Sequence, residues 1–112
     1  MESGRSSLNV LVALDQVEDP QNLGAVIRSC GFFRIKALVI PRKHSCPVTP
    51  SVSKASSGVA EWFPVITVNN LTRFLEQRKT EGYWVVGLDV EEGQKIHELE
   101  IDREMILVLG SE

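Results

Sequence analysis

Residues 9–28 read NVLVALDQVEDPQNLGAVIR, an apolar run followed by a polar turn and then a helical pattern. Asp19 is a suitable helix N-cap, and Pro20 suits the first helical position. The apolar residues beyond the turn recur at the i, i+3, i+4, i+7 spacing of one buried helix face: Leu23, Val26, Ile27 and Cys30. This stretch therefore predicts a buried strand, a tight turn and a helix, which is the repeating unit of an α/β fold.

The rest of the chain repeats this alternation. Strands are expected at residues 9–14, 37–40, 64–68, 83–88 and 105–109. Helices are expected at residues 20–33, 49–61 and 71–79, the last capped by Asn69 or Asn70, and residues 91–102 form a polar stretch with one helical turn. Nearly unbroken apolar strands between helices are typical of a parallel sheet covered by helices on both faces. We expect one α/β domain over residues 9–112 after an N-terminal tail at residues 1–8.

Composition excludes several classes of protein. The 112 residues are 43% hydrophobic and 24% charged, as in globular proteins, and no apolar run is long enough for a membrane span. The net charge of −3 argues against a protein that coats nucleic acid through bulk positive charge, although a local basic patch is compatible with it. The two cysteines and two histidines lack metal-ligand spacing, so no metal is expected. A cytoplasmic or organelle-matrix location follows.

The flank of the first helix carries a candidate phosphate contact. Arg28 lies off the buried stripe, and Gly24 is four residues earlier on the same flank. Because helical side chains lean toward the helix N-terminus, we expect Arg28 to fold back across the gap at Gly24 toward Asn22. Ligands of open parallel sheets bind beyond the carboxyl ends of the strands, and a guanidinium suits a phosphate there. The equally weighted alternative is that Gly24 only permits close helix packing and Arg28 is solvated.

Three segments together resemble a known family. The run DxVxDPxNxGAxxRS at residues 15–29 resembles motif 1 of the SpoU branch of the SPOUT RNA methyltransferases. Residues 106–112, ILVLGSE, resemble the opening of motif 2, and residues 53–61, SKASSGVAE, are similar to the segment between them. The resemblance implies a trefoil-knot α/β domain that transfers a methyl group from S-adenosylmethionine to a ribose 2′-hydroxyl of RNA. Residues 42–50 are most similar to members that modify large-subunit ribosomal RNA.

The resemblance also implies roles for individual residues. Those at the catalytic centre are Asn22, Arg28 and Glu112. Those that hold S-adenosylmethionine, largely through the backbone, are Gly87, Leu88, Leu109, Gly110 and Ser111. The family acts as a homodimer. Motif 3, which closes the cofactor pocket and the knot, is missing after residue 112, so we expect a C-terminally truncated domain with little activity by itself.

Several cations are candidates for contacts with RNA phosphates. Two groups flank the second predicted strand: Arg34 with Lys36 before it, and Arg42, Lys43 and His44 after it. Lys54 lies in the next predicted helix, where it would face the same cleft as these groups. A solvated loop is an equally weighted interpretation of Arg42 and Lys43, since most charge clusters only face solvent.

Methyl transfer to a hydroxyl requires alignment and removal of a proton. Since a guanidinium keeps its proton, we favour Arg28 as a phosphate clamp, with Asn22 orienting the ribose. A non-catalytic RNA-binding or assembly module that retains the fold is the alternative function. A generic nucleotide-binding domain is the weakest candidate, because neither a GxGxxG nor a Walker loop follows any predicted strand.

Overall fold

A computed structural model of the chain describes residues 9–33, 35–43, 48–89, 98 and 101–110. Their elements, in chain order, are β1 (Val10–Asp15), α1 (Pro20–Phe32), β2 (Ala37–Pro41), α2 (Pro50–Ala55), the 3-10 helix η2 (Val59–Glu61), β3 (Val65–Val68), α3 (Leu71–Thr80), β4 (Trp84–Asp89) and β5 (Met105–Gly110). All five predicted strands are confirmed. The tail at residues 1–8 and most of the stretch 91–102 lie outside the described residues.

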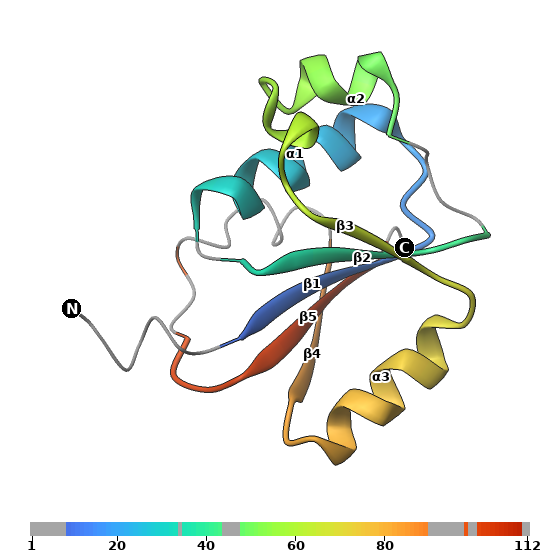
Figure 1. Ribbon diagram of the computed structural model, residues 1–112, viewed down its shortest axis with the longest axis vertical. Coiled ribbons are helices and arrows are strands. Elements are labelled where there is room, and N and C mark those ends of the chain that lie inside the picture. The colour runs from blue at the N-terminus through green and yellow to red at the C-terminus, as the bar shows by residue number, and fades with distance from the viewer. Residues whose placement is uncertain (1–8, 34, 44–47, 90–97, 99–100, 111–112) are drawn as a thin grey trace.

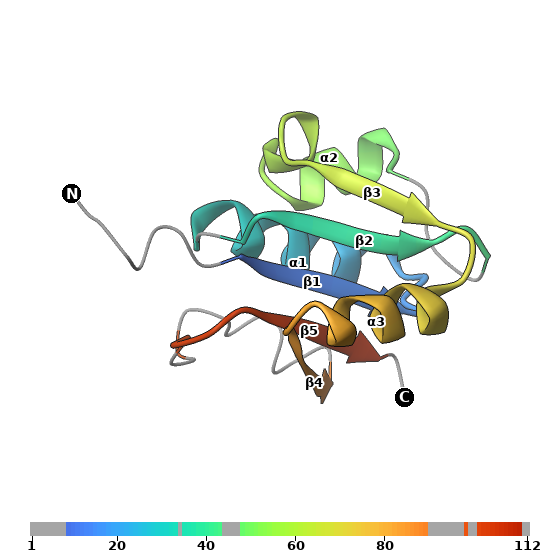
Figure 2. The same cartoon turned by 60° about the horizontal axis from the view of Figure 1, so that its bottom comes forward.

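The strands form one sheet in the order β3-β2-β1-β5-β4, and every neighbouring pair is parallel. Figure 2 shows the five strands stacked in this order. Helices α1 and α2 cover one face of the sheet and α3 covers the other (Figure 1). The predicted parallel α/β sheet with helices on both faces is therefore confirmed. Within the described part of the chain, no helix has the length and apolar character needed to cross a membrane.

Strand β1 shows why the sheet must be covered by helices on both faces. Val10, Val12 and Leu14 pack into the core beneath α1, whereas Leu11 and Ala13 join the core beneath α3. Successive side chains of a strand point to opposite faces, so an unbroken apolar run can be buried only between two layers. The edge strands β3 and β4, by contrast, consist of half-buried and exposed residues.

The connection through α3 determines where along the sheet a ligand can bind. The chain leaves β3 at one edge of the sheet, crosses the face through α3 and enters β4 at the other edge. Strand β5 then returns to the centre beside β1. The chain moves outward from β1 through β2 to β3 on one side and returns inward from β4 to β5 on the other, so the direction of the strand order reverses between β1 and β5. In open α/β sheets this switch point is where ligands bind.

Helix α1 begins as its sequence predicts. The Asp19 carboxylate accepts a hydrogen bond from the backbone N–H of Gln21 at 2.9 Å, and Pro20 occupies the first helical position. The predicted buried stripe is confirmed, because all four of its residues are buried: Leu23, Val26, Ile27 and Cys30. The stripe anchors the start of α1 beside the carboxyl end of β1.

The prediction of a single helix over residues 49–61 is wrong. Helix α2 ends at Ala55, and η2 begins only at Val59. Between them Ser57 and Gly58 have positive φ angles of 57° and 84°, which a continuing helix cannot contain. The N–H of Gly58 bonds back to the Ser53 carbonyl at 2.8 Å, a bond that ends a helix with a left-handed residue.

Ser56 stabilises this break from inside the protein. Its side chain is 0% exposed, donates to the Ser53 carbonyl at 2.9 Å and accepts from the Ala60 N–H at 3.0 Å. We expect Ser56→Ala to lower the free energy of unfolding by about 1 to 3 kcal/mol, because it removes both bonds of a buried hydroxyl and leaves the half-buried Ala60 N–H without its acceptor. Urea denaturation measures this change.

Ser51→Ala is the matched control for Ser56→Ala, because Ser51 is exposed on the same helix. It should change the free energy of unfolding by no more than about 0.5 kcal/mol. Equal effects of the two variants would show that the Ser56 hydroxyl does not stabilise the break.

Candidate functional site

The central strands end side by side at the carboxyl edge of the sheet. Asp15 of β1 lies opposite Gly110 of β5, and Gly110 lies opposite Asp89 of β4. Around Gly87 and Gly110 the space is open: a Cβ atom added to either would meet nothing within 4 Å. These two glycines therefore leave room for a ligand to approach the backbone of β4 and β5.

Four of the five predicted cofactor positions converge at this edge. Leu88 is paired with Leu109, one residue before the pair formed by Asp89 and Gly110, and Gly87 precedes Leu88. The Leu109 side chain is fully buried, and Leu88 packs against the same core, so each can offer a ligand mainly its backbone. Ser111, the fifth position, and the predicted catalytic Glu112 lie outside the described residues.

Asn22 lies in the first turn of α1, near the end of β1. It is half-buried, and its side-chain amide has no hydrogen-bond partner among the described residues. The turn that precedes it contains Gln16, whose φ of 64° lies in the left-handed region. Val17 is buried and holds this turn against the core. An unpaired amide at the switch point is available to hydrogen-bond a ligand.

Arg28 does not lie where the sequence analysis placed it. A Cβ on Gly24 would lie 2.4 Å from the Cβ of Ala55 and 2.9 Å from its carbonyl carbon, so α2 fills the expected gap. The Arg28 side chain is exposed, and its guanidinium lies 6.0 Å from the ring centroid of Phe32, one turn toward the C-terminal end of α1. The expectation that Arg28 folds back across Gly24 is wrong, and the packing interpretation of Gly24 is confirmed.

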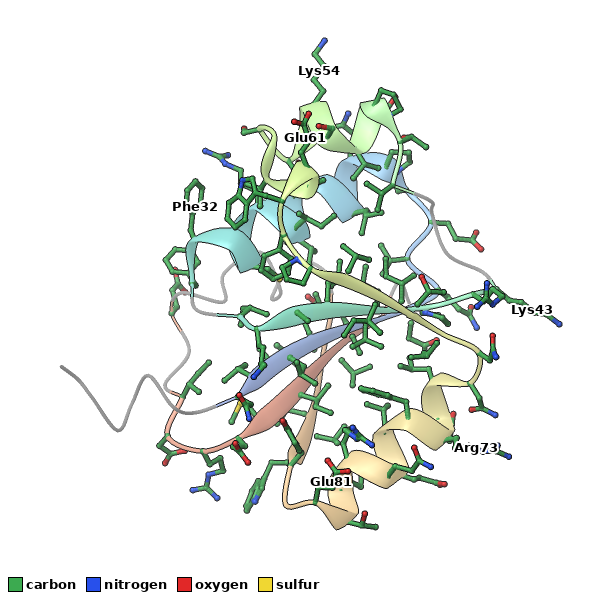
Figure 3. All side chains as sticks on the ribbon, viewed as in Figure 1. Phe32, Lys43, Lys54, Glu61, Arg73 and Glu81 are labelled. Atoms are coloured by element: carbon green, nitrogen blue, oxygen red, sulfur yellow. The ribbon has the colours of Figure 1, made fainter. Side chains whose placement is uncertain are left out.

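Arg42, Lys43 and Lys54, which are also predicted to contact RNA, do not form one cluster. Arg42 and Lys43 are exposed directly after β2, at the carboxyl edge of the sheet. Lys54 projects from the outer side of α2, away from the sheet and from Lys43 (Figure 3). The structure therefore brings only Arg42 and Lys43 to the edge where the glycines and Asn22 lie.

Asn69 is one of two residues expected to cap α3, but its side chain contacts Arg42 instead. The Arg42 Nε donates to the Asn69 Oδ1 at 2.7 Å, while Asn70 caps α3 by accepting from the Arg73 N–H at 2.9 Å. Pro41 and Val68 are paired at the ends of β2 and β3, which brings the residues that follow them together. The sequence contained a signal for this contact, since Asn69 comes directly after a strand.

Cys30 can be excluded as a nucleophile. Burial raises the pKa of the Cys30 thiol to about 12, so the reactive thiolate is scarce at neutral pH. Among the described residues, no three His, Cys, Asp or Glu side chains are grouped so that they could hold a metal ion. Among the described residues, the carboxyl edge thus offers backbone groups, the Asn22 amide, cations, and the carboxylates of Asp15 and Asp89.

The structure thus defines a class of α/β protein. Its sheet is parallel, and Gly87 and Gly110 leave open space at the carboxyl edge, near the start of α1. Residues 9–112 match the profile of the SpoU rRNA Methylase family. The match covers most of the chain, which therefore belongs to this family, as motifs 1 and 2 indicated.

Curated relatives carry names that fit this family. The chain is 41% identical over 108 residues to the 23S rRNA (guanosine-2′-O-)-methyltransferase RlmB of Coxiella burnetii, and the match covers 96% of this chain and 43% of that protein. It is 41% identical over 107 residues to the mitochondrial rRNA methyltransferase 1 of Dictyostelium discoideum, covering 90% of this chain and 20% of that protein. The chain thus spans less than half the length of either relative.

Solved structures agree on the fold. A TrmH-family protein from Porphyromonas gingivalis superposes with a TM-score of 0.73 at 26% identity, covering 93% of this chain and 42% of that one. The SpoU methyltransferase AviRb from Streptomyces viridochromogenes, solved in complex with the cofactor AdoMet, gives a TM-score of 0.68 at 21% identity, covering 93% and 41%.

The packing of Gly24 on α2 can be tested by substitution. Gly24→Ala forces the new methyl group into the Ala55 side chain and backbone. Overpacking of this kind costs about 1 to 3 kcal/mol, against a gain of about 1 kcal/mol from better helix propensity. We expect a net loss of up to about 2 kcal/mol in the free energy of unfolding, measured by urea denaturation.

Gly87→Ala serves as the control for Gly24→Ala, since a Cβ at Gly87 meets nothing within 4 Å. It should leave the free energy of unfolding nearly unchanged. A Gly24→Ala variant that is more stable than the unaltered chain would contradict the close packing of α1 on α2.

Proposed function

We propose that this chain is the methyl-transferring domain of an RNA ribose 2′-O-methyltransferase that uses S-adenosylmethionine, with ribosomal RNA as its substrate. The observation that carries the proposal is the open space around Gly87 and Gly110 at the switch point. The 41% identity to a 23S rRNA (guanosine-2′-O-)-methyltransferase supports the reaction and the class of RNA. A cytoplasmic or organelle-matrix location is proposed with it, and the free, buried Cys30 thiol fits a reducing compartment.

The residues at the ends of β4 and β5 suit S-adenosylmethionine. The backbone of Gly87, Leu88, Leu109 and Gly110 would hold it, together with Ser111. Backbone N–H and C=O groups next to apolar side chains are typical of pockets for flat, partly apolar ligands. When bound, the cofactor supplies a methyl group activated by a sulfonium.

The substrate side of the proposed site consists of Asn22, Arg28 and Glu112. The unpaired Asn22 amide is available to orient the ribose hydroxyl, whose oxygen would bond to the methyl carbon as the bond from that carbon to the sulfonium sulfur breaks. The hydroxyl proton must leave in the same reaction, and a carboxylate such as Glu112 can accept it. Arg28 retains its proton, so its proposed role is to hold an RNA phosphate through paired N–H donors. Lys54 is proposed to contact RNA phosphates outside this group.

We expect Arg28→Lys to lower turnover about 100-fold, because the ammonium keeps the charge but loses the fork that aligns the ribose. The measurement is transfer of labelled methyl from S-adenosylmethionine to a ribosomal RNA transcript. Arg103→Lys is the control, since Arg103 precedes β5 at the opposite edge of the sheet and stacks on Trp84 at 4.2 Å from the ring centroid. Near-normal turnover of Arg28→Lys would exclude the clamp.

Calorimetry with S-adenosylmethionine separates the enzyme from the alternative module. Binding to the unaltered chain supports the proposed enzyme, and Arg28→Lys should leave this affinity unchanged, since Arg28 is assigned to the substrate side. Because motif 3 is expected to complete the cofactor pocket, the deciding case is a longer chain that includes it: RNA binding there without affinity for S-adenosylmethionine would identify the non-catalytic RNA-binding or assembly module.

We also propose that the protein is a homodimer. Phe32 is 62% exposed and Trp62 is 63% exposed, and the Trp62 ring packs over Gly31, where an added Cβ would lie 3.2 Å from it. Two large aromatic side chains are thus exposed together at the C-terminal end of α1, with Arg28 beside them. Aromatic side chains with a neighbouring arginine are enriched at subunit interfaces.

The dimer can be tested by sedimentation. Trp62→Asp should raise the dimer Kd about 30-fold or more, because a buried interface tryptophan contributes about 2 kcal/mol or more to binding. Trp84→Asp is the matched control: Trp84 is 58% exposed but lies on β4, remote in sequence from this pair. A monomeric unaltered chain, or equal effects of the two variants, would contradict an interface at Trp62.

A further inference from the structure

The charge of this chain is distributed unevenly along the sequence. The net charge is −3, yet residues 20–75 contain seven Lys or Arg side chains and a single acidic one, Glu61. This segment builds β2 and β3 and the start of α3. The acidic residues at the carboxyl edge lie elsewhere: Asp15 ends β1, Glu18 and Asp19 follow it in the turn before α1, and Asp89 ends β4. One half of the carboxyl edge is thus basic and the other half acidic.

Three cations gather in the basic half. Arg42 and Lys43 follow β2, and Arg73 lies in the first turn of α3, which begins three residues after β3 ends. The contact between Arg42 and Asn69 ties the end of β2 to this turn. Figure 3 shows Lys43 and Arg73 extending from the same side of the molecule, away from its body. These three side chains come from segments thirty residues apart in sequence that the pairing of β2 with β3 brings together.

All three cations are available to a ligand. They are exposed, and none forms an ion pair with a described residue. Glu76 lies one turn beyond Arg73 on α3 and is exposed without pairing with it. The bond from Arg42 Nε to Asn69 fixes one side of the guanidinium, so its two terminal nitrogens remain as a fork for an anion. By contrast, Arg78 at the other end of α3 is paired with Glu81 at 3.1 Å.

We propose that Arg42, Lys43 and Arg73 form a phosphate-binding surface that holds the backbone of the RNA substrate against the β2–β3 half of the carboxyl edge. The inference rests on the proposed function and adds Arg73 to the expected contacts. The acidic ends of β1 and β4 repel the RNA backbone, so the strand is directed to the basic half, with the target nucleotide reaching toward Asn22. Phosphate contacts of this kind position an RNA without reading its sequence.

Fluorescence anisotropy with a labelled ribosomal RNA hairpin tests the surface, with the chain free of S-adenosylmethionine. Each phosphate contact steepens the fall of log affinity with log salt by about 0.7 for single strands and about 0.9 for duplexes. We expect Arg73→Gln to weaken binding about threefold to fivefold at low salt and to make this fall shallower by one such increment. Arg73→Lys, which keeps the charge, should retain the slope.

Lys79→Gln is the matched control, because Lys79 is exposed in the last turn of the same helix and its loss changes the net charge equally. It should leave RNA affinity nearly unchanged. Equal losses of RNA affinity in Arg73→Gln and Lys79→Gln would show that only the net charge matters, and would contradict the proposed phosphate-binding surface. An unaltered chain that does not bind RNA would contradict it as well. Calorimetry with S-adenosylmethionine on the same variants distinguishes failure of the proposed surface from failure of the proposed methyltransferase function. If the surface only binds RNA, the variants that lose RNA affinity should keep the cofactor affinity of the unaltered chain.

Discussion

The pairing of β1 with β5 is the interaction on which the rest of the structure depends. Six residue pairs, from Val10 with Met105 to Asp15 with Gly110, join the two ends of the described chain in a parallel ladder. Parallel strands cannot be joined by a tight turn, so the chain between them must cross the sheet through helices. Crossovers of this kind are right-handed, and those from β1 to β2 and from β3 to β4 run in opposite directions across the sheet, so α1 and α3 lie on opposite faces.

Small residues determine how the helices lie on this sheet. Gly24 and Gly31 let α1 approach Ala55, Val59 and Trp62 so closely that a Cβ at either position would overlap a neighbouring atom. The close approach has a consequence for the outer flank of α1. Arg28 is excluded from the helix interface and lies beside Phe32 in solvent, so its proposed contact with RNA depends on a surface that is free to meet another molecule.

The electrostatics of the carboxyl edge follow from the strand order. Because β2 and β3 lie on one side of β1 and β4 and β5 on the other, the basic residues 42, 43 and 73 are separated from Asp89 across the sheet. The glycines proposed to accommodate the cofactor lie in the acidic half and the proposed RNA backbone contacts in the basic half. Asn22, at the start of α1, lies near the centre, where two ligands that must react with each other would meet.

The sequence by itself determined the fold class, the five strands and the start of α1, because apolar periodicity and capping are local properties of residues such as Asp19 and Leu23. It also determined the family through motifs at residues 15–29 and 106–112. It did not reveal the break at Ser57 and Gly58. The spacing of apolar residues carries no information about backbone angles, and both residues have the positive φ angles that end the helix. The path of Arg28 and the contact between Arg42 and Asn69 were decided only by tertiary structure. Both depend on which segments become neighbours when the strands pair, a non-local property that the spacing along one helix or strand does not contain.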